Sequence, residues 1–327
     1  LVTSQYLEAD FAVIGYQYPK DWKTAISMAT PNVFDSPVQK VTFKDGIYQY
    51  SPLKVWTGNY YSFFAYYPYE DESIELFDAD YEGSPYIKYT HPTSTDPSNM
   101  VDIMTASYID THVDASPEVR MKMEHRLSAI DIMARNYYQY TDESDVPHLV
   151  TIEITDLTLS LTTYKGAQIY LDSNYEGLNG SSIVPFDYDE KTGIAPTQTI
   201  AYKFPSLDIN PNGSDDTAFR QISKDGKTLL MIPQPNEAMK GVLNMTYKKR
   251  YTPKDENGND LEDAYIINDK DNTAVFTEEI DLSQYDCRLK EGSRYYIEIT
   301  FTSDAVSVNI LKSDEWDELD DVELEFE

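Results

Sequence analysis

Two neighbouring stretches, Val150-Thr-Ile-Glu-Ile154 and Leu157-Thr-Leu-Ser-Leu161, alternate apolar and polar residues at every position. Successive side chains of a β-strand point to opposite faces, so this pattern predicts strands with one buried face. The same alternation recurs in Tyr295-Tyr-Ile-Glu-Ile-Thr-Phe301 and Val306-Ser-Val-Asn-Ile310. Many short strands separated by Pro, Gly, Asn and Asp are typical of antiparallel β-sandwiches. We therefore predict an all-β protein with few short helices.

The length of the chain and one polar stretch predict two domains. With 327 residues, the chain has room for roughly two domains of the usual ~150 residues. The stretch Tyr140-Thr-Asp-Glu-Ser-Asp-Val-Pro147 is polar and acidic, ends in proline, and has a strand-rich half on either side. We predict one antiparallel β-sandwich domain over residues 1–145 and a second over residues 146–327, with their junction near residues 140–150.

The charge balance excludes several classes of partner. The chain carries 57 Asp and Glu against 26 Lys and Arg, a net charge of −31. Nucleic-acid-binding proteins present basic surfaces to phosphate, so we expect no nucleic-acid partner. The same charge opposes docking on an anionic membrane, and no apolar run reaches the ~18–20 residues of a membrane span. Hydrophobic residues still make up 41% of the chain, which is enough to build real cores.

The sequence contains no recognisable catalytic or metal-binding constellation. It has no Gly-rich phosphate loop, no Gly-x-Ser-x-Gly elbow and no His-Glu-x-x-His. Its single cysteine, Cys287, excludes an intrachain disulfide, and we expect it to be a small hydrophobe in a strand. Alternation puts His125 on one face with Val119, Met121, Met123 and Leu127, which predicts an inward-facing histidine without metal. We expect no enzymatic activity, no cofactor and no metal site.

The acidic stretch Asp255-Glu-Asn-Gly-Asn-Asp260 superficially resembles a calcium loop. Its glycine falls at the fourth position, whereas the EF-hand loop requires glycine at the sixth. The Asn257-Gly258 dipeptide instead favours a turn between two strands. Residues 253–263 are therefore predicted to form the tip of a hairpin.

The acidic end of the chain, residues 314–327, includes one segment patterned as a strand. In Val322-Glu-Leu-Glu-Phe-Glu327 the apolar residues Val322, Leu324 and Phe326 alternate with three glutamates. A terminal segment of this kind can complete the edge of a sheet, and each large apolar side chain that it buries contributes ~1.5–3 kcal/mol. Two alternatives are open: the segment adds to a neighbouring molecule, or it is the closing strand of its own C-terminal domain.

Several strings, taken together in their order and spacing, resemble the fimbrillin family, the subunits of the type V pili that Gram-negative gut and oral anaerobes export as lipoproteins. The strings are Tyr60-Tyr-Ser-Phe-Phe-Ala-Tyr-Tyr-Pro68, Met100-Val-Asp-Ile-Met-Thr-Ala106, Val119 to Leu127, Ser128-Ala-Ile-Asp-Ile132, Leu229-Leu-Met-Ile-Pro-Gln234, Leu289-Lys-Glu-Gly-Ser-Arg-Tyr-Tyr-Ile-Glu-Ile299 and Trp316. The resemblance spans nearly the whole chain. It implies two transthyretin-like β-sandwich domains and a non-enzymatic, structural subunit of an extracellular fimbrium that supports cell adhesion.

The resemblance also implies an assembly mechanism. Family members are cut by an outer protease, typically after an arginine, which removes the first strand of the N-terminal domain and opens a groove for the C-terminal strand of the next subunit. Leu1-Val-Thr-Ser resembles the region just after such a cut, because Phe11-Ala-Val-Ile14 matches the first strand after cleavage. The start at Leu1 is expected of a processed or trimmed product.

On this interpretation residues 1–145 carry the acceptor groove, and Val322, Leu324 and Phe326 are the donor-strand residues within segment 314–327. The partners are other pilin subunits in a head-to-tail polymer. Membrane attachment is expected only through a lipid anchor on the precursor, which would be exported through the outer membrane to the cell surface.

The alternative function is a surface glycan-binding lipoprotein, or a pilus-tip adhesin without a polymerising donor strand. Trp22 and Trp56 are the candidate ligand-stacking aromatics, and both are equally compatible with a place in a core. The partners would then be host or microbial surface glycans or proteins, and binding of the isolated monomer to a glycan array would favour this alternative.

Overall fold

The computed structural model describes residues 7–55, 57–78, 80–112, 118–177, 180–210, 219–223, 228–263, 265–266, 275–303, 305–313 and 322–325. Strands dominate this part of the chain, and the helices in it are single turns: α1 (Trp22–Ala25), η1 (Ile26–Met28), η2 (Pro97–Asn99) and η4 (Leu282–Gln284). None of these helices is long or apolar enough to cross a membrane. The prediction of an all-β fold with mainly antiparallel sheets and few short helices is confirmed.

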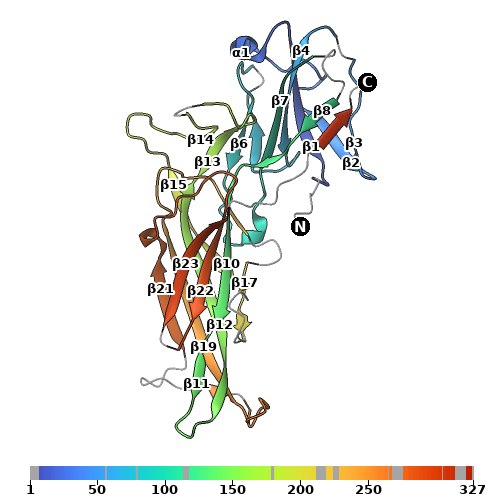
Figure 1. The fold of residues 1–327 in the computed structure, drawn as a ribbon. Helices are drawn as coiled ribbons and strands as arrows, with labels where there is room; N and C mark the ends of the chain where they lie inside the picture. The colour runs from blue at the N-terminus through green and yellow to red at the C-terminus, as the bar shows by residue number, and fades with distance from the viewer. Residues whose placement is uncertain are drawn as a thin grey trace.

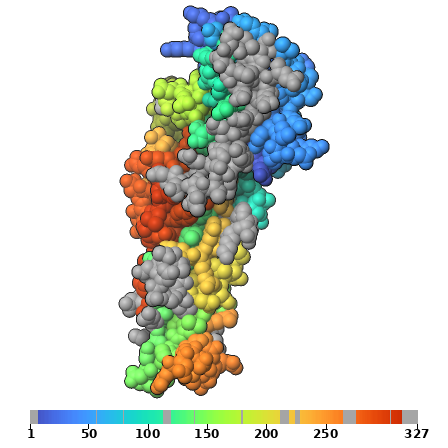
Figure 2. Space-filling view, turned by 45° about the vertical axis from the view of Figure 1, so that its right-hand side comes forward, coloured from blue at the N-terminus to red at the C-terminus, as the bar shows by residue number. Residues whose placement is uncertain are grey.

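The strands form two bodies, here called the N-terminal body and the C-terminal body, which lie end to end (Figure 1). Figure 2 shows the resulting elongated shape, with the blue N-terminal residues at one end and an orange hairpin of the C-terminal body at the other.

The N-terminal body is built in three layers. The middle layer is a six-stranded sheet in the order β3 (Ile47–Gln49), β2 (Gln39–Lys44), β1 (Phe11–Tyr18), β4 (Tyr60–Tyr67), β7 (Met104–His112) and β9 (Glu124–His125). One outer layer is a four-stranded sheet in the order β14 (Ile183–Pro185), β13 (Gly166–Tyr170), β6 (Tyr86–Thr90) and β5 (Ile74–Leu76). The other outer layer is a strand pair, β24 (Val322–Glu325) and β8 (Glu118–Met121).

The central strands β1 and β4 are buried on both faces, which explains their nearly continuous apolar sequences. In β1, Ala12 and Ile14 belong to the core cluster shared with the four-stranded sheet. Phe11 and Val13, which point the other way, belong to a second cluster shared with β8. The six-stranded sheet therefore has a core on each face.

The C-terminal body consists of two sheets. The first has the order β17 (Arg220–Gln221), β10 (Ser128–Asn136), β22 (Arg294–Phe301) and β23 (Val306–Ser313), with β18 (Leu229–Met231) also on β10. The second has the order β11 (Gln139–Thr141), β12 (Pro147–Tyr164), β19 (Gly241–Pro253) and β20 (Tyr265–Ile266), with β15 (Thr197–Phe204), β16 (Leu207–Ile209) and β21 (Phe276–Asp281) alongside. Side chains of both sheets form one core cluster between them. Among the strand pairs that the structure describes, only β10 and β22 run parallel.

The long strand β12 joins the two alternating stretches that predict the fold. Ile154 ends the first buried row and Leu157 begins the second, so the two rows are out of phase by one residue. A bulge absorbs the mismatch: Ile154 pairs with Tyr247 while Asp156 pairs with Thr246, which leaves Thr155 as the extra residue. The bulge keeps both rows on the core face of one continuous strand.

The path of the chain corrects the predicted domain boundary. Residues 140–147 form the turn between β11 and β12, where Thr141 pairs with Pro147 inside one sheet. The chain passes between the bodies elsewhere: after Leu127 into β10, back into β13 at Gly166, again into β15, and finally to β24. The boundary is not visible in the sequence because both bodies share the same two-residue periodicity.

The predicted hairpin tip at residues 253–263 is confirmed, since β19 and β20 pair antiparallel on either side of it. The Asp255 carboxylate accepts hydrogen bonds from the backbone N–H groups of Asn257 and Asn259, both at 2.8 Å. Gly258 has a φ of +82°, a conformation that glycine adopts without steric cost. The acidic residue at this site stabilises the turn.

Candidate functional site

The C-terminal strand β24 pairs with β8 of the N-terminal body of the same chain (Figure 1). The ladder is antiparallel and places Val322 opposite Met121 and Leu324 opposite Val119. Phe326, the third predicted donor residue, lies outside the described residues, as does segment 314–321. The assignment of this strand to the C-terminal domain is therefore corrected, because its ladder lies on the N-terminal body.

Strand β8 lies over one of the two cores of the N-terminal body. Val119 and Met121 are both 0% exposed and pack in the cluster that contains Phe11 and Phe63 of the six-stranded sheet. Within the described ranges, β24 is the only strand that pairs with β8. The edge of β8 is thus a strand-binding site, and the end of this chain occupies it.

His125 is largely buried, as the alternation predicts. Its imidazole Nδ1 lies 2.7 Å from Asp102 Oδ2, and its side chain is 13% exposed. β8 ends at Met121 and β9 begins at Glu124, but Met123 and Leu127 are 2% and 0% exposed, so the alternation continues through His125. In the described part of the chain, no group of three or more His, Cys, Asp or Glu side chains is arranged to hold a metal ion.

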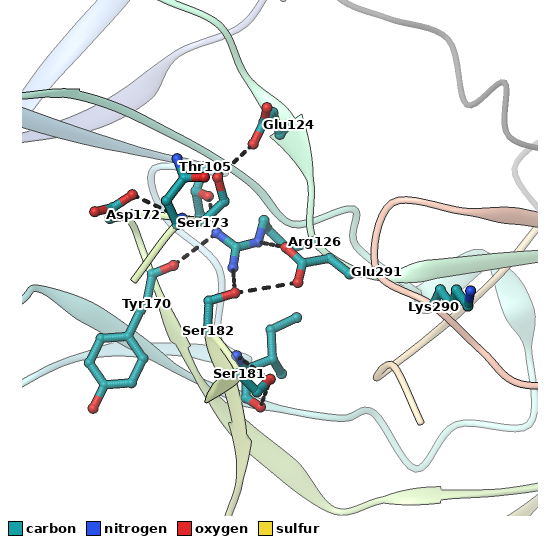
Figure 3. A network of polar contacts seen from close by, with 12 residues as sticks. Thr105, Glu124, Arg126, Tyr170, Asp172, Ser173, Ser181, Ser182, Lys290 and Glu291 are labelled. Atoms are coloured by element: carbon teal, nitrogen blue, oxygen red, sulfur yellow. Dashed lines mark hydrogen bonds and ion pairs between the residues drawn. The ribbon is translucent and has the colours of Figure 1, made fainter. Parts of the chain in front are cut away.

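The next residue, Arg126, is fully buried. It lies in a polar network where the two bodies meet (Figure 3). Its Nη1 donates to Thr105 Oγ1 at 2.6 Å and to the Tyr170 carbonyl at 2.9 Å, and its Nη2 donates to Ser182 Oγ at 2.8 Å. Its Nε lies 2.5 Å from Glu291 Oε1. The guanidinium thereby joins three segments of the N-terminal body to the turn that precedes β22 of the C-terminal body.

The pKa values of both members of the Arg126–Glu291 pair are shifted by their surroundings. Burial lowers the pKa of Arg126 and raises the pKa of Glu291, and the attraction between the two charges opposes both effects. A guanidinium remains protonated near neutral pH, so Glu291 supplies its counter-charge. No sequence pattern distinguishes Arg126 from an exposed arginine, because its burial depends on segments that are distant in the chain.

The two candidate stacking aromatics do not form an exposed binding surface. The Trp22 ring is 5% exposed and lies in the core of the N-terminal body, with ring centroids 4.9 Å from Tyr16 and 5.2 Å from Phe64. It is therefore not accessible to a sugar ring. Trp56 lies outside the described residues.

A cleft of about 360 Å³ lies beside the interbody network. Its walls include the rings of Tyr164 and Tyr188, the ring of Pro233, and the charged side chains of Lys290 and Glu291. The combination of flat apolar rings and charged groups suits a small polar ligand with an apolar face.

Cys287 lies in the loop before β22 rather than in a strand, packed at the edge of the C-terminal core. Burial raises the pKa of its thiol to about 11, which keeps it protonated near neutral pH and unreactive as a nucleophile. Its expected role as a small hydrophobe is consistent with this position, although the expected strand is absent at residue 287.

Comparisons with known proteins agree with this architecture. A family model described as fimbrillin-like matches residues 16–314. Among solved structures, the chain is similar to a fimbrial protein from Bacteroides vulgatus, with a TM-score of 0.61 and 19% identity over 93% of this chain and 92% of that one. At this level of identity the likeness concerns the fold alone.

A protein from Bacteroides uniformis that is assigned to cell adhesion gives a TM-score of 0.44 and 15% identity, over 96% of this chain and 94% of that one. No curated protein matches the sequence.

Proposed function

Because this chain belongs to the fimbrillin-like family, we propose that it is a structural subunit of a cell-surface pilus and that it polymerises by donating its C-terminal strand. The observation that carries the proposal is the ladder between β24 and β8, in which the N-terminal body accepts a strand from the end of a chain. Strand addition pairs the backbone groups of the two strands and places every second side chain of the added strand in a pocket. It therefore provides affinity and fixes the register between the two strands.

The same arrangement accounts for a polymer rather than a closed dimer. The donor lies at the C-terminus and the acceptor lies on β8, so the two surfaces differ and repeated addition in trans runs head to tail. In this proposal Val322, Leu324 and Phe326 are the donor residues. Their role as donor residues is supported by the apolar cluster that Val119 and Met121 of the acceptor strand form with the six-stranded sheet.

The proposal extends to export. A pilus subunit of this kind would reach the cell surface as a lipoprotein precursor, and proteolysis would prepare its acceptor groove. The support is the family membership. A lipid-modified cysteine and an arginine cleavage site in the precursor, identified by mass spectrometry of the membrane-bound and polymeric forms, would test this part of the proposal.

The donor assignment is tested by a paired substitution, Leu324→Asp with Phe326→Asp, against Glu323→Gln as the matched control. A charge placed at an apolar donor position opposes burial, whereas the control leaves the apolar row intact. We expect the double variant to remain a folded monomer and to form no fibres by negative-stain electron microscopy. Fibres of normal length and number from the double variant would contradict the donor role.

A second candidate function, glycan binding at a pilus tip, is favoured by the cleft whose lining includes Tyr164 and Tyr188. Binding of the purified monomer to a glycan array, lost in Tyr188→Ala and retained in Trp22→Phe, would support it. The retained binding in Trp22→Phe is expected because Trp22 is buried and is not among the residues that line the cleft.

A further inference from the structure

We propose that the C-terminal strand caps the acceptor surface of its own subunit, so that the edge of β8 is the site for which the chain's own strand and the strand of a second copy compete. This inference rests on the proposed function, because it takes the second occupant to be the donor strand of another subunit. It adds to that function a defined acceptor surface and a self-capped free state.

The first argument is the occupancy of the β8 edge. Four residue pairs join β24 to β8, from Val322 with Met121 to Glu325 with Glu118. A donor strand arriving from a second copy would need these same backbone groups. One strand edge can pair with only one strand at a time, so the two strands exclude each other.

The second argument is the shortness of the ladder. β24 and β8 form a sheet of their own, and β24 has four residues. β8 packs on the core, whereas the ladder joins β24 to it through four residue pairs, so this contact can open locally without unfolding the sheets beneath it. The cap is therefore exchangeable.

The third argument is reach within one chain. Ser313, at the end of β23, pairs with Arg294, which also pairs with Ala129 of β10. Two strand spacings separate Ser313 from Ala129, or ~10 Å. β8 ends only eight residues before Ala129 in sequence. Nine residue steps from Ser313 to Val322 allow a separation of up to ~30–32 Å, and Val322 of the same chain pairs with Met121 of β8 within that limit.

The fourth argument is charge. Residues 314–327 contain nine Asp and Glu and no Lys or Arg. The β8 segment carries two exposed basic residues, Arg120 and Lys122, in a chain of net charge −31, and the register puts Glu323 opposite Arg120. The opposite charges of Glu323 and Arg120 favour this pairing and the like charges of Glu325 and Glu118 oppose it, so the electrostatic attraction is concentrated at Arg120.

The competition between the two strands has a predictable direction. Two binding elements joined by a short stretch of one chain meet at an effective concentration on the order of 1 mM, so at about 10 μM protein the strand of the same chain is favoured about 100-fold over an identical strand in trans. Dilute subunits should therefore remain monomeric and capped. Polymers should form when the cap is released or when the subunit concentration approaches the effective concentration.

A disulfide across the ladder distinguishes the two occupants. The full chain would carry Arg120→Cys and Glu323→Cys, with Cys287→Ala to remove the native thiol. Residues directly opposite in an antiparallel pair have Cα atoms ~4.5–5.5 Å apart, which lies within the range that a disulfide spans. A matched control carries Arg120→Ser and Glu323→Ser in the same Cys287→Ala background, so that the charges are removed without a link.

Oxidation at about 1 μM protein should give an intrachain disulfide, seen as a faster-migrating monomer on a non-reducing gel and as a cross-linked peptide by mass spectrometry. The oxidised protein should not polymerise at concentrations at which the serine control does, and reduction should restore polymerisation. Together these results would support the cap.

Three results would count against the proposal. A ladder of interchain disulfides at 1 μM without the intrachain product would refute the cap and leave the donor-strand function intact. Polymerisation of the oxidised monomer at the rate of the serine control would refute both the cap and the donor role. If the intrachain disulfide forms but neither the reduced protein nor the serine control polymerises at any concentration, the proposed function fails, and with it the competition, although the cis pairing stands.

A second variant tests the linkage without altering the ladder. Extending residues 314–321 fourfold with Gly-Ser repeats lowers the effective concentration about eightfold, following the −3/2 power of linker length. The concentration at which polymers first form should fall by a similar factor. An unchanged threshold would show that the strand of the same chain does not compete for β8.

Discussion

The two bodies of this protein close their cores in different ways. In the C-terminal body, β12 and β19 have 18 and 13 residues and share one ladder from His148 paired with Pro253 to Leu161 paired with Gly241. In the N-terminal body, the outer layer over the second core is the short pair β8 and β24. Long ladders between neighbouring strands make a closed unit, whereas a short pair completed by the chain terminus leaves one layer that can be exchanged.

The largest expected effect comes from breaking the junction between the bodies. Arg126→Ala removes a 0%-exposed charge, the hydrogen bonds that Arg126 donates to Thr105 and Ser182, and the counter-charge of Glu291. Breaking a buried ion pair in this way costs ~3–5 kcal/mol. We expect a loss of this size in urea unfolding, with the bodies unfolding in separate transitions.

Two further substitutions at the same junction can be compared with the loss of stability in Arg126→Ala. Glu291→Gln should cost less than Arg126→Ala, because the Glu291 side chain is 34% exposed and water partly solvates the charge. Arg126→Lys keeps the charge but loses the forked hydrogen bonds. A single unchanged transition in Arg126→Ala would mean that the network does not couple the two bodies.

A matched pair of core truncations measures the difference between the bodies directly. Leu159 in β12 and Met121 in β8 are both 0% exposed. Truncations of this kind cost ~2–5 kcal/mol, with the smaller values where the surroundings can collapse. We expect Leu159→Ala near the upper end and Met121→Ala near the lower end, by chemical denaturation. Equal losses would show that the β8 layer is packed as rigidly as the C-terminal core.

Hydrogen exchange should show the same contrast without a large change in stability. Amides of β8 should exchange through local opening, and those of β12 only through global unfolding. Deleting residues 322–327 should speed exchange in β8 at least tenfold, because the only described partner strand of β8 is lost. Exchange in β12 serves as the internal control and should not change. Equal acceleration in both strands would mean that β24 stabilises the whole molecule.

The smallest expected effect is a pH dependence at a contact between the bodies. His91 is buried, with Nδ1 2.9 Å from the Pro92 carbonyl oxygen and Nε2 3.1 Å from the Leu230 carbonyl oxygen. Burial lowers the pKa of His91 in the folded chain. Below the unfolded-state pKa of about 6.5, the unfolded chain takes up a proton at His91 before the folded chain does. The contribution of neutral His91 to the free energy of unfolding is therefore complete above that pH and is lost on acidification.

We therefore expect the melting temperature to fall between pH 7 and pH 5.5, and to fall less in His91→Gln than in the unmodified chain. Differential scanning calorimetry of both proteins at the two pH values separates this effect from the titration of the many carboxylates, which both proteins share. An identical decrease in both would exclude His91 as its source.

The sequence alone determined the features that depend on local pattern. Two-residue periodicity identifies strands and their buried faces, and it correctly predicted an all-β fold and the apolar face of Val119 and Met121. Asn257-Gly258 marked a turn, because glycine adopts its backbone conformation freely. The alternation of Val322, Leu324 and Phe326 marked a strand, and the structure describes strand β24 over the first four residues of that segment.

Only the tertiary structure decided which strands meet. Residues 140–147 are as polar as a linker but form a turn within one sheet, since the partner of β11 lies beyond the turn. Arg126 is buried because segments around Thr105, Tyr170 and Glu291 converge on it. The alternation of apolar and polar residues predicts that a strand has an apolar face, but it does not specify the partner strand. Pairing depends on the backbone edges that the rest of the fold leaves open. For β24 that edge is β8 of the N-terminal body.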